Sequence, residues 1–309
     1  MASCLPVTTQ FLTGLETRSA TPADLHAVAA LVAAAEVHDI GEAFLSADDI
    51  QVGWNRSEFD LDTDSLLVFD GDQLVALAEV CGGRADVTVS PTWRRRGIGT
   101  ELLAWTEARA AKQGPTNGRL TLGQTLPNMA ADAVSLLTRN GYSPTHTSWA
   151  LSLPDEVLIE MPQLPDGIEI RPYRPQSEER AAYQVVEDAF NEWPGRVPMC
   201  FEQWQTWVTD RPNFDESMLL VAADRDEIVG VGLGLEYEDE GWVEQLAVRR
   251  DRRGEGLAKA LLSALFSTFR QRQFSRMGIS TDSRTGALDL YLGLGMVVDY
   301  TFTRYTKEL

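Results

Sequence analysis

Residues 89–99 read Val-Ser-Pro-Thr-Trp-Arg-Arg-Arg-Gly-Ile-Gly, and residues 248–258 read Val-Arg-Arg-Asp-Arg-Arg-Gly-Glu-Gly-Leu-Ala. Each stretch lies between a strand-like segment and an apolar helical segment that contains a Leu-Leu pair, at 102–103 and at 261–262. Every position of the second copy follows its counterpart in the first by 159 residues. A constant spacing across a strand, a glycine loop and a helix indicates a duplicated domain.

The pattern shared by the two copies, Arg-x-x-Gly-x-Gly/Ala, predicts a phosphate-binding loop in each half. The first N–H groups of a helix have no intrahelical partner, and the helix dipole adds partial positive charge there. Together they form an anion site, and glycine lets a pyrophosphate approach the backbone closely. The residues predicted to contact this ligand are Val89, Arg94, Arg95, Gly97, Ile98 and Gly99 in the first copy, and Leu246, Ala247, Val248, Arg253, Gly254, Gly256, Leu257 and Ala258 in the second.

A basic turn that merely caps a helix is the alternative interpretation of one such stretch. Two aligned copies, each with arginine three residues before the first aligned glycine, favour the phosphate site. The loop is not a Walker A motif, because no Gly-Lys-Ser/Thr follows it. It is not a Rossmann fingerprint either, because the third glycine and a ribose-binding acid are missing.

The two loops resemble the acetyl-CoA signature of the GCN5-related N-acetyltransferase family, Gln/Arg-x-x-Gly-x-Gly/Ala after the fourth strand. A second resemblance lies downstream, where residues 287–296 read Ala-Leu-Asp-Leu-Tyr-Leu-Gly-Leu-Gly-Met and residues 133–142 give a weaker version. The resemblance covers nearly the whole chain as two tandem units, an arrangement similar to that of mycothiol synthase and of some antibiotic-modifying acetyltransferases. It implies acetyl-CoA as co-substrate, no metal, and an α/β fold of two domains, each a mixed, mostly antiparallel sheet flanked by helices.

The chain has 309 residues, which suits two domains of ordinary size. We expect an N-terminal domain over 1–153, a proline-containing linker over 154–166 and a C-terminal domain over 167–309. The N-terminal domain is expected to be catalytically inactive and the C-terminal domain to carry the chemistry. Strand-like and helical segments alternate in both, which predicts a sheet of mixed direction.

Composition excludes several classes of protein. The formal net charge is −19, divided as about −11 before residue 161 and about −8 after it, so nucleic acid is not an expected partner. No long apolar run or signal sequence is present, and we expect a cytoplasmic protein without a membrane span. The three cysteines, Cys4, Cys81 and Cys200, lack the close spacing of a zinc site. A monomer or homodimer is expected.

Acetyl transfer to an amine needs a base for the amine proton and an acid for the departing thiolate. Tyr291 lies where the resemblance places the general acid, and Glu244 lies on the strand where the family often places a base. The corresponding first-half residues are Leu137 and Ala85, whose side chains can act neither as an acid nor as a base. Alternation along residues 242–248 puts Glu244 on an apolar, covered face, where its pKa would be raised. A core tyrosine and a solvent-facing glutamate are the alternatives.

The acceptor is expected to be a small, cationic molecule with a primary amine, because an acidic chain favours a cation. Acidity that only aids solubility is the alternative. Glu192, Trp193 and Tyr237 are the predicted acceptor contacts, since aromatic and acidic groups together suit a cation. Residues 236–240 could instead be an ordinary solvated hairpin tip. An acetyl-CoA sensor without turnover and a protein N-acetyltransferase remain as alternative functions.

Overall fold

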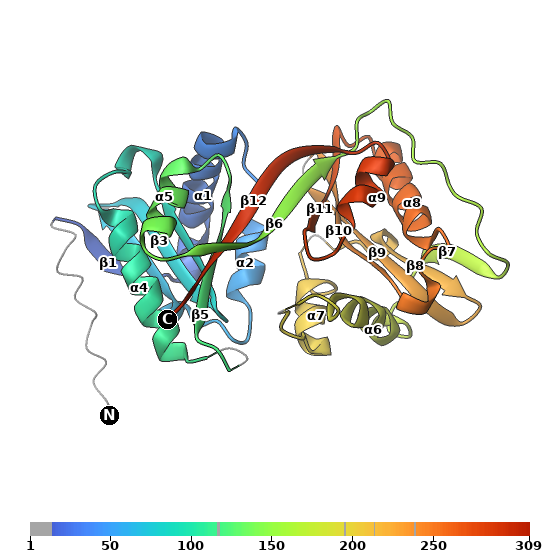
Figure 1. The fold of residues 1–309 in the computed structure, drawn as a ribbon, viewed down its shortest axis with the longest axis horizontal. Coiled ribbons are helices and arrows are strands. Elements are labelled where there is room, and N and C mark those ends of the chain that lie inside the picture. The colour runs from blue at the N-terminus through green and yellow to red at the C-terminus, as the bar shows by residue number, and fades with distance from the viewer. Residues whose placement is uncertain (1–13, 116–117, 195, 213, 238) are drawn as a thin grey trace. The chain divides into compact units, whose positions relative to one another are not determined.

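The computed structural model describes residues 14–115, 118–194, 196–212, 214–237 and 239–309. Cys4 therefore lies outside the described residues, as does Glu238. The chain forms two compact units (Figure 1). The first takes residues 1–145 and 302–309, and the second takes residues 146–301. The C-terminal residues, 302–309, thus belong to the first unit.

The first unit begins with a capped turn. Thr21 is the N-cap of a 3-10 turn whose first residue is Pro22, and Asp24 closes a capping box with Thr21. The helices are α1 (Leu25–Ile40), α2 (Ala47–Trp54), α3 (Leu61–Asp64), α4 (Ile98–Gln113) and α5 (Ala131–Arg139), with 3-10 turns η1 (Pro22–Asp24) and η2 (Pro91–Trp93). The strands are β1 (Glu16–Arg18), β2 (Ser65–Asp70), β3 (Gln73–Cys81), β4 (Arg84–Val89) and β5 (Thr121–Pro127).

Strand order in the first unit is β1-β2-β3-β4-β5-β12, where β12 is Val297–Glu308. Neighbouring strands are antiparallel except β4 and β5, which are parallel. The core lies on both faces of this sheet. Ala76 and Ala78 pack with Ile98 and Leu102 of α4 on one face, and Leu77 packs in the cluster that contains α1 on the other.

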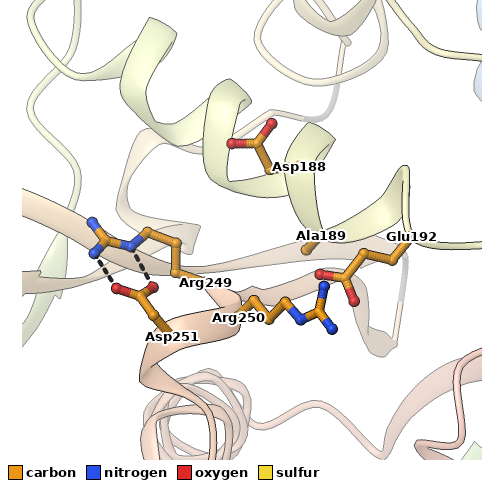
Figure 2. Close-up of a pocket in the computed structure, with 6 residues that line it drawn as sticks. All are labelled: Asp188, Ala189, Glu192, Arg249, Arg250 and Asp251. Carbon is orange, nitrogen blue, oxygen red and sulfur yellow. Dashed lines mark hydrogen bonds and ion pairs between the residues drawn. The ribbon is translucent and has the colours of Figure 1, made fainter.

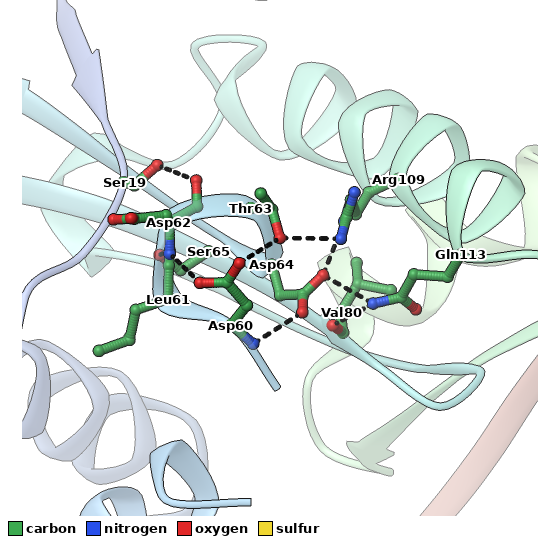
Figure 3. A network of polar contacts seen from close by, with 10 residues as sticks. All are labelled: Ser19, Asp60, Leu61, Asp62, Thr63, Asp64, Ser65, Val80, Arg109 and Gln113. Carbon is green, nitrogen blue, oxygen red and sulfur yellow. Dashed lines mark hydrogen bonds and ion pairs between the residues drawn. The ribbon is translucent and has the colours of Figure 1, made fainter. Parts of the chain in front are cut away.

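A buried carboxylate holds the short helix α3 against α4 (Figure 3). Asp64 is 2% exposed and accepts hydrogen bonds from the Asp60 N–H at 2.9 Å, Arg109 Nε at 2.6 Å and Gln113 Nε2 at 2.7 Å. Gln113 Nε2 also donates to the carbonyl of Val80 at 3.1 Å. Because the buried charge is paired and fully hydrogen-bonded, it fixes the start of β2 relative to the helix that follows the first glycine loop.

The second unit repeats this order of elements. Its helices are α6 (Glu179–Phe190), α7 (Phe201–Trp207), α8 (Leu257–Gln271) and α9 (Leu288–Gly293), with 3-10 turns η3 (Glu216–Met218) and η4 (Arg250–Arg252). Its strands are β6 (Ser143–Ser152), β7 (Ile168–Pro172), β8 (Leu219–Asp224), β9 (Glu227–Tyr237), β10 (Glu240–Val248) and β11 (Arg276–Asp282), in the order β6-β11-β10-β9-β8-β7.

Helix α8 packs closely on β9 because three alternate residues of that strand are glycines. A Cβ atom at Gly230 or Gly232 would lie 3.2 Å or 3.1 Å from leucine side chains of α8, and one at Gly234 would lie 2.9 Å from Phe269. Larger residues at these positions would push the helix off the sheet. The position of α8 matters for function, because its N-terminus carries the second glycine loop.

The C-terminal end of the chain forms a single long strand. One continuous strand, β12, runs from Val297 to Glu308. Its residues 302–308 pair antiparallel with β5, from Phe302 opposite Pro127 to Glu308 opposite Thr121. No turn interrupts the strand because residues 297–308 contain neither glycine nor proline. The mixed, mostly antiparallel sheet with flanking helices is as predicted.

Candidate active site

The two strand–loop–helix junctions have the same backbone hydrogen bonds. The Ser90 N–H donates to the Val75 carbonyl at 2.9 Å, and the Arg249 N–H donates to the Val229 carbonyl at 2.9 Å. A 3-10 turn follows in each, and then a glycine with positive φ caps the helix: Gly97 at +87° and Gly256 at +82°. Only glycine adopts this conformation freely. The duplication predicted from the motif is therefore a duplication of loop conformation.

Each loop leaves the first N–H groups of its helix available to an anion. The first N–H that bonds back to the cap is that of Thr100 in α4 and that of Ala260 in α8. The N–H groups of Ile98 and Gly99, and of Leu257 and Ala258, precede these bonds. Helix N-termini of this kind bind phosphate groups, and α4 and α8 run for 16 and 15 residues.

The aligned arginines do not point outward as free positive charges. Arg94 donates to both carboxylate oxygens of Asp39, at 2.5 and 2.9 Å, and to the Val89 carbonyl at 3.3 Å. Arg253 does the same with Glu192, at 2.9 and 3.0 Å, and with the Val248 carbonyl at 3.3 Å. Each arginine thus ties its loop to the end of its own strand. It also pairs with a carboxylate at the end of a helix, since Asp39 lies in the last turn of α1 and Glu192 follows α6 by two residues.

The two loops differ at the residue that follows this arginine. Arg95 has φ of +64°, a conformation that is uncommon for a side chain other than glycine, and Gly254 takes the corresponding position at +82°. Arg95 pairs with Asp132 at 2.6 Å, and both side chains are mostly exposed. In the second loop Arg252 pairs with Asp224 at 2.8 Å and with Glu255 at 3.0 Å. Most of the arginine charge at both loops is therefore balanced by carboxylates.

In each unit, the two parallel central strands, β4 and β5 or β10 and β11, separate next to the glycine loop. In the second unit β10 and β11 pair in parallel from Glu240 opposite Arg276 to Val243 opposite Ile279, where the described ladder ends. β10 continues to Val248 and β11 to Asp282. Among the described residues, β11 makes no ladder pair with residues 245–248 of β10. This edge of β10, from Gln245 to the glycine loop, suits an extended ligand that hydrogen-bonds to main chain.

Glu244 lies at a β-bulge, and this changes its predicted surroundings. The β9–β10 register shifts between Val243 and Gln245, so Glu244 is the extra residue of β10. Trp242 faces Gly278 on one side of the sheet, while Leu246 packs in the core cluster on the other. The predicted covered face over 242–248 is therefore wrong: Glu244 is exposed. The bulge reverses the alternation that the prediction assumed.

Tyr291 lies in the core beneath α9. Its side chain is 5% exposed and packs in the cluster that contains the inner residues of α8, and burial raises the pKa of its phenol. The neighbouring Leu290 and Leu292 are exposed, so the tyrosine is the inward residue of this short helix. The first-unit counterpart, Leu137, is buried as well. The catalytic role of Tyr291 remains a prediction.

The predicted acceptor residues occupy two ends of the second unit. Glu192 lines an open pocket of about 560 Å³ between the end of α6 and η4, with Asp188, Ala189, Arg249, Arg250 and Asp251 (Figure 2). Trp193 stacks on Phe190 with ring centroids 4.4 Å apart, and the Arg284 guanidinium lies 5.5 Å from the Trp193 ring. Tyr237 lies at the hairpin, opposite Glu240. The strand between that hairpin and the loop spans roughly 25 Å, so Tyr237 and Glu192 do not meet.

Sequence reasoning missed three features of the site. Asp39 was not predicted as the partner of Arg94, and Arg284 was not predicted beside Trp193. Gln245 accepts a hydrogen bond from Trp204 Nε1 at 3.2 Å, which ties α7 to the strand just after the bulge. No motif marks these residues, because each contact joins segments that are distant in sequence.

Metal-ligating groups and membrane-spanning helices are both absent from the described residues. Within them, no group of His, Cys, Asp and Glu side chains could hold a metal ion. None of the described helices has both the length and the apolar character needed to cross a membrane.

The model of the acetyltransferase (GNAT) family matches residues 35–142 and 180–296, one segment in each half. The chain belongs to the acetyltransferase (GNAT) family. It is therefore an acetyltransferase built as two tandem domains of that family. A solved GCN5-related N-acetyltransferase from Sphaerobacter thermophilus has a TM-score of 0.77 at 31% identity, over 95% of each chain.

Relatives with a named activity extend over most of the chain. A mycothiol acetyltransferase from Salinispora tropica is 32% identical over 222 residues, 69% of each protein. Another from Thermomonospora curvata is 28% identical over 300 residues, 94% of this chain and 93% of that protein. A tandem GNAT protein from the clavulanic acid biosynthesis pathway has a TM-score of 0.72 at 17% identity, which shows likeness of fold.

Proposed function

We propose that this acetyltransferase moves the acetyl group of acetyl-CoA to the primary amine of a small molecule, with the chemistry in the second unit. One observation carries the proposal. The second unit combines the glycine loop, the parted strands with Glu244 at the bulge, and the inward Tyr291. The first unit has its own loop, but Ala85 and Leu137 stand at the two catalytic positions.

The residues present fit acetyl-CoA as co-substrate. The N–H groups of Leu257 and Ala258, behind the positive-φ glycines Gly254 and Gly256, would receive the diphosphate. The unpaired edge formed by Leu246, Ala247 and Val248 would hydrogen-bond to the amides of the pantetheine arm. Arg253 would contribute by holding the loop, since its own charge is balanced by Glu192.

The chemistry of the transfer assigns one task to each side chain. The amine lone pair attacks the thioester carbonyl, a C–N bond forms, and the C–S bond breaks as its electron pair goes to sulfur. Glu244, exposed at the bulge, takes the amine proton directly or through water, and Tyr291 gives its proton to the departing thiolate. A backbone N–H beside the bulge stabilises the transient oxyanion. The raised pKa of Tyr291 keeps the phenol protonated until the sulfur leaves.

The names of the relatives direct the choice of acceptor. Because they are mycothiol acetyltransferases, the acceptor proposed here is a small amine of the mycothiol series, of the cysteinyl amino-sugar type. Trp193 follows Glu192, which pairs with Arg253 of the loop, and is a proposed acceptor contact, whereas Tyr237 would contribute only to an acceptor that extends along β10. The first unit is proposed to bind acetyl-CoA through Gly97, Ile98 and Gly99 without turnover.

The test is free-thiol release from acetyl-CoA in the presence of a panel of amines. The panel contains cysteinyl amino-sugars, aminoglycosides, polyamines, amino acids and short peptides. The proposal predicts release with one small-molecule class, and first with the cysteinyl amino-sugars. Release with peptides alone would indicate a protein acetyltransferase. No thiol release with any of these amines, while acetyl-CoA still binds, would indicate an acetyl-CoA sensor.

A further inference from the structure

Residues 157–162, called the strap below, lie along helix α8. Ser263 Oγ donates to the Ile159 carbonyl at 2.7 Å, and Ile159 is 8% exposed in the core cluster. At the C-terminal end of α8, the Arg270 guanidinium donates to the Val157 carbonyl. Polar and apolar contacts thus fasten the strap to one helix over much of its length. Leu158 and Met161 point outward, at 72% and 52% exposed.

The strap ends on the second glycine loop. A Cβ atom built at Gly256 would meet Cβ and Cγ of Pro162, each at 3.5 Å. The corresponding position of the first loop is Gly97, where a Cβ atom would meet nothing within 4 Å. The two loops therefore share their backbone conformation but differ in their surroundings: one is open and one has a proline ring against it.

A proline ring at this place has two physical effects on the loop. It packs on Gly256, whose φ of +82° is held by the loop and helix around it, and so opposes the return of that residue to commoner conformations. It also excludes water from one side of the helix N-terminus, and hydrogen bonds from N–H groups to an anion strengthen when water is excluded. Both effects favour a bound diphosphate at the second loop over the first.

We propose that Pro162 is a positioning residue of the second phosphate loop, and that the strap gives this loop a higher affinity for the diphosphate of a CoA thioester than the open first loop has. The identity of the ligand rests on the function proposed above. The strap acts from outside the reacting groups. Its effect is therefore expected on the binding of CoA and not on the rate of the chemical step.

The experiment compares Pro162→Gly with Met161→Gly in the full-length protein. Both variants loosen the same backbone, but only the first removes the ring from Gly256. CoA itself is the probe, titrated by calorimetry, with steady-state kinetics on acetyl-CoA beside it. Pro162→Gly is expected to weaken one class of CoA sites about tenfold and to raise the KM for acetyl-CoA equally, with kcat unchanged. Met161→Gly is expected to leave both within about twofold.

Equal effects of the two variants, or tighter CoA binding by Pro162→Gly, would overturn the proposal. If Pro162→Gly does not fold, Ser263→Ala serves instead, because it removes the anchor at Ile159 without touching the loop. It should weaken CoA binding in the same direction, and wild-type affinity would contradict the strap's role. Failure of the wild type to bind CoA would contradict the proposed function. Wild-type CoA affinity in Pro162→Gly would contradict only the role of the strap.

Discussion

Arg253 and Glu192 form a two-point ion pair, with guanidinium nitrogens 2.9 and 3.0 Å from the two carboxylate oxygens. The pair joins the second glycine loop to Glu192, which lies two residues after the end of α6. Arg94 and Asp39 form the same pair in the first unit, at 2.5 and 2.9 Å. An arginine that the motif marks as a phosphate ligand is thus, in both copies, a link between loop and helix. Its guanidinium geometry, which a lysine cannot reproduce, explains that use.

The first prediction separates this linking role of Glu192 from direct contact with the acceptor. Glu192→Gln removes the charge that holds Arg253 and should loosen the loop. The KM for acetyl-CoA is expected to rise about threefold, with the KM for the amine unchanged. Asp188→Asn is the matched control, because Asp188 lines the same pocket and bonds to Gln184 instead. A rise confined to the KM of the amine would make Glu192 an acceptor contact.

The second prediction concerns the buried network around Asp64. Asp64→Asn keeps the shape of the side chain but leaves Arg109 without its anionic partner. Breaking a buried charge pair of this kind costs about 3 kcal/mol of the free energy of unfolding. Denaturant unfolding measures it, with Asp62→Asn as control, because the exposed Asp62 takes part in the described hydrogen bonds through its backbone. A loss below about 1 kcal/mol for Asp64→Asn would contradict the account.

The third prediction is a pH dependence of stability that comes from Glu79. Burial raises the pKa of Glu79 to about 7, and the charge of Asp86 adds to the rise. The hydrogen bond that Trp54 Nε1 donates to this carboxylate at 2.7 Å opposes the rise, as do Arg84 and Arg56. Between about pH 4.5 and 7 the unfolded chain loses this proton while the folded protein keeps it. The folded state is therefore penalised progressively as the pH rises through that window, and fully above it.

Glu79→Gln removes the penalty and keeps an oxygen for Trp54. The variant is expected to match the wild type near pH 4.5 and to exceed its free energy of unfolding by about 2 kcal/mol at pH 8. Asp72→Asn, in the exposed β2–β3 turn, should leave the profile unchanged. A constant difference between Glu79→Gln and the wild type across the pH range would refute the assignment.

The sequence predicted the repeated parts of this fold well, and the physical reason is locality. The apolar helical segments after the two motifs became α4 and α8, and the paired glycine loops took matching conformations. Glycine with positive φ, a helix start and a strand end are signals carried by neighbouring residues. The predicted duplication, mixed sheet and family were confirmed for this reason.

The features that the sequence did not predict depend on distant segments. A bulge at Glu244 needs the register of β9, which no residue of β10 specifies by itself. The pairing of Phe302 with Pro127 joins residues far apart in sequence, so the continuous last strand could not be foreseen. The placement of Pro162 against Gly256 is of the same kind. The catalytic roles of Tyr291 and Glu244 stay predictions.

The most direct test of the central claim compares Tyr291→Phe with Tyr142→Phe in the thiol-release assay. Both tyrosines are buried, at 5% and 2% exposed, but Tyr142 belongs to the first unit. The account predicts that Tyr291→Phe lowers turnover at least about tenfold with acetyl-CoA binding intact, while Tyr142→Phe keeps wild-type turnover. Unchanged turnover in Tyr291→Phe, or an equal loss in both variants, would contradict chemistry centred on Tyr291 in the second unit.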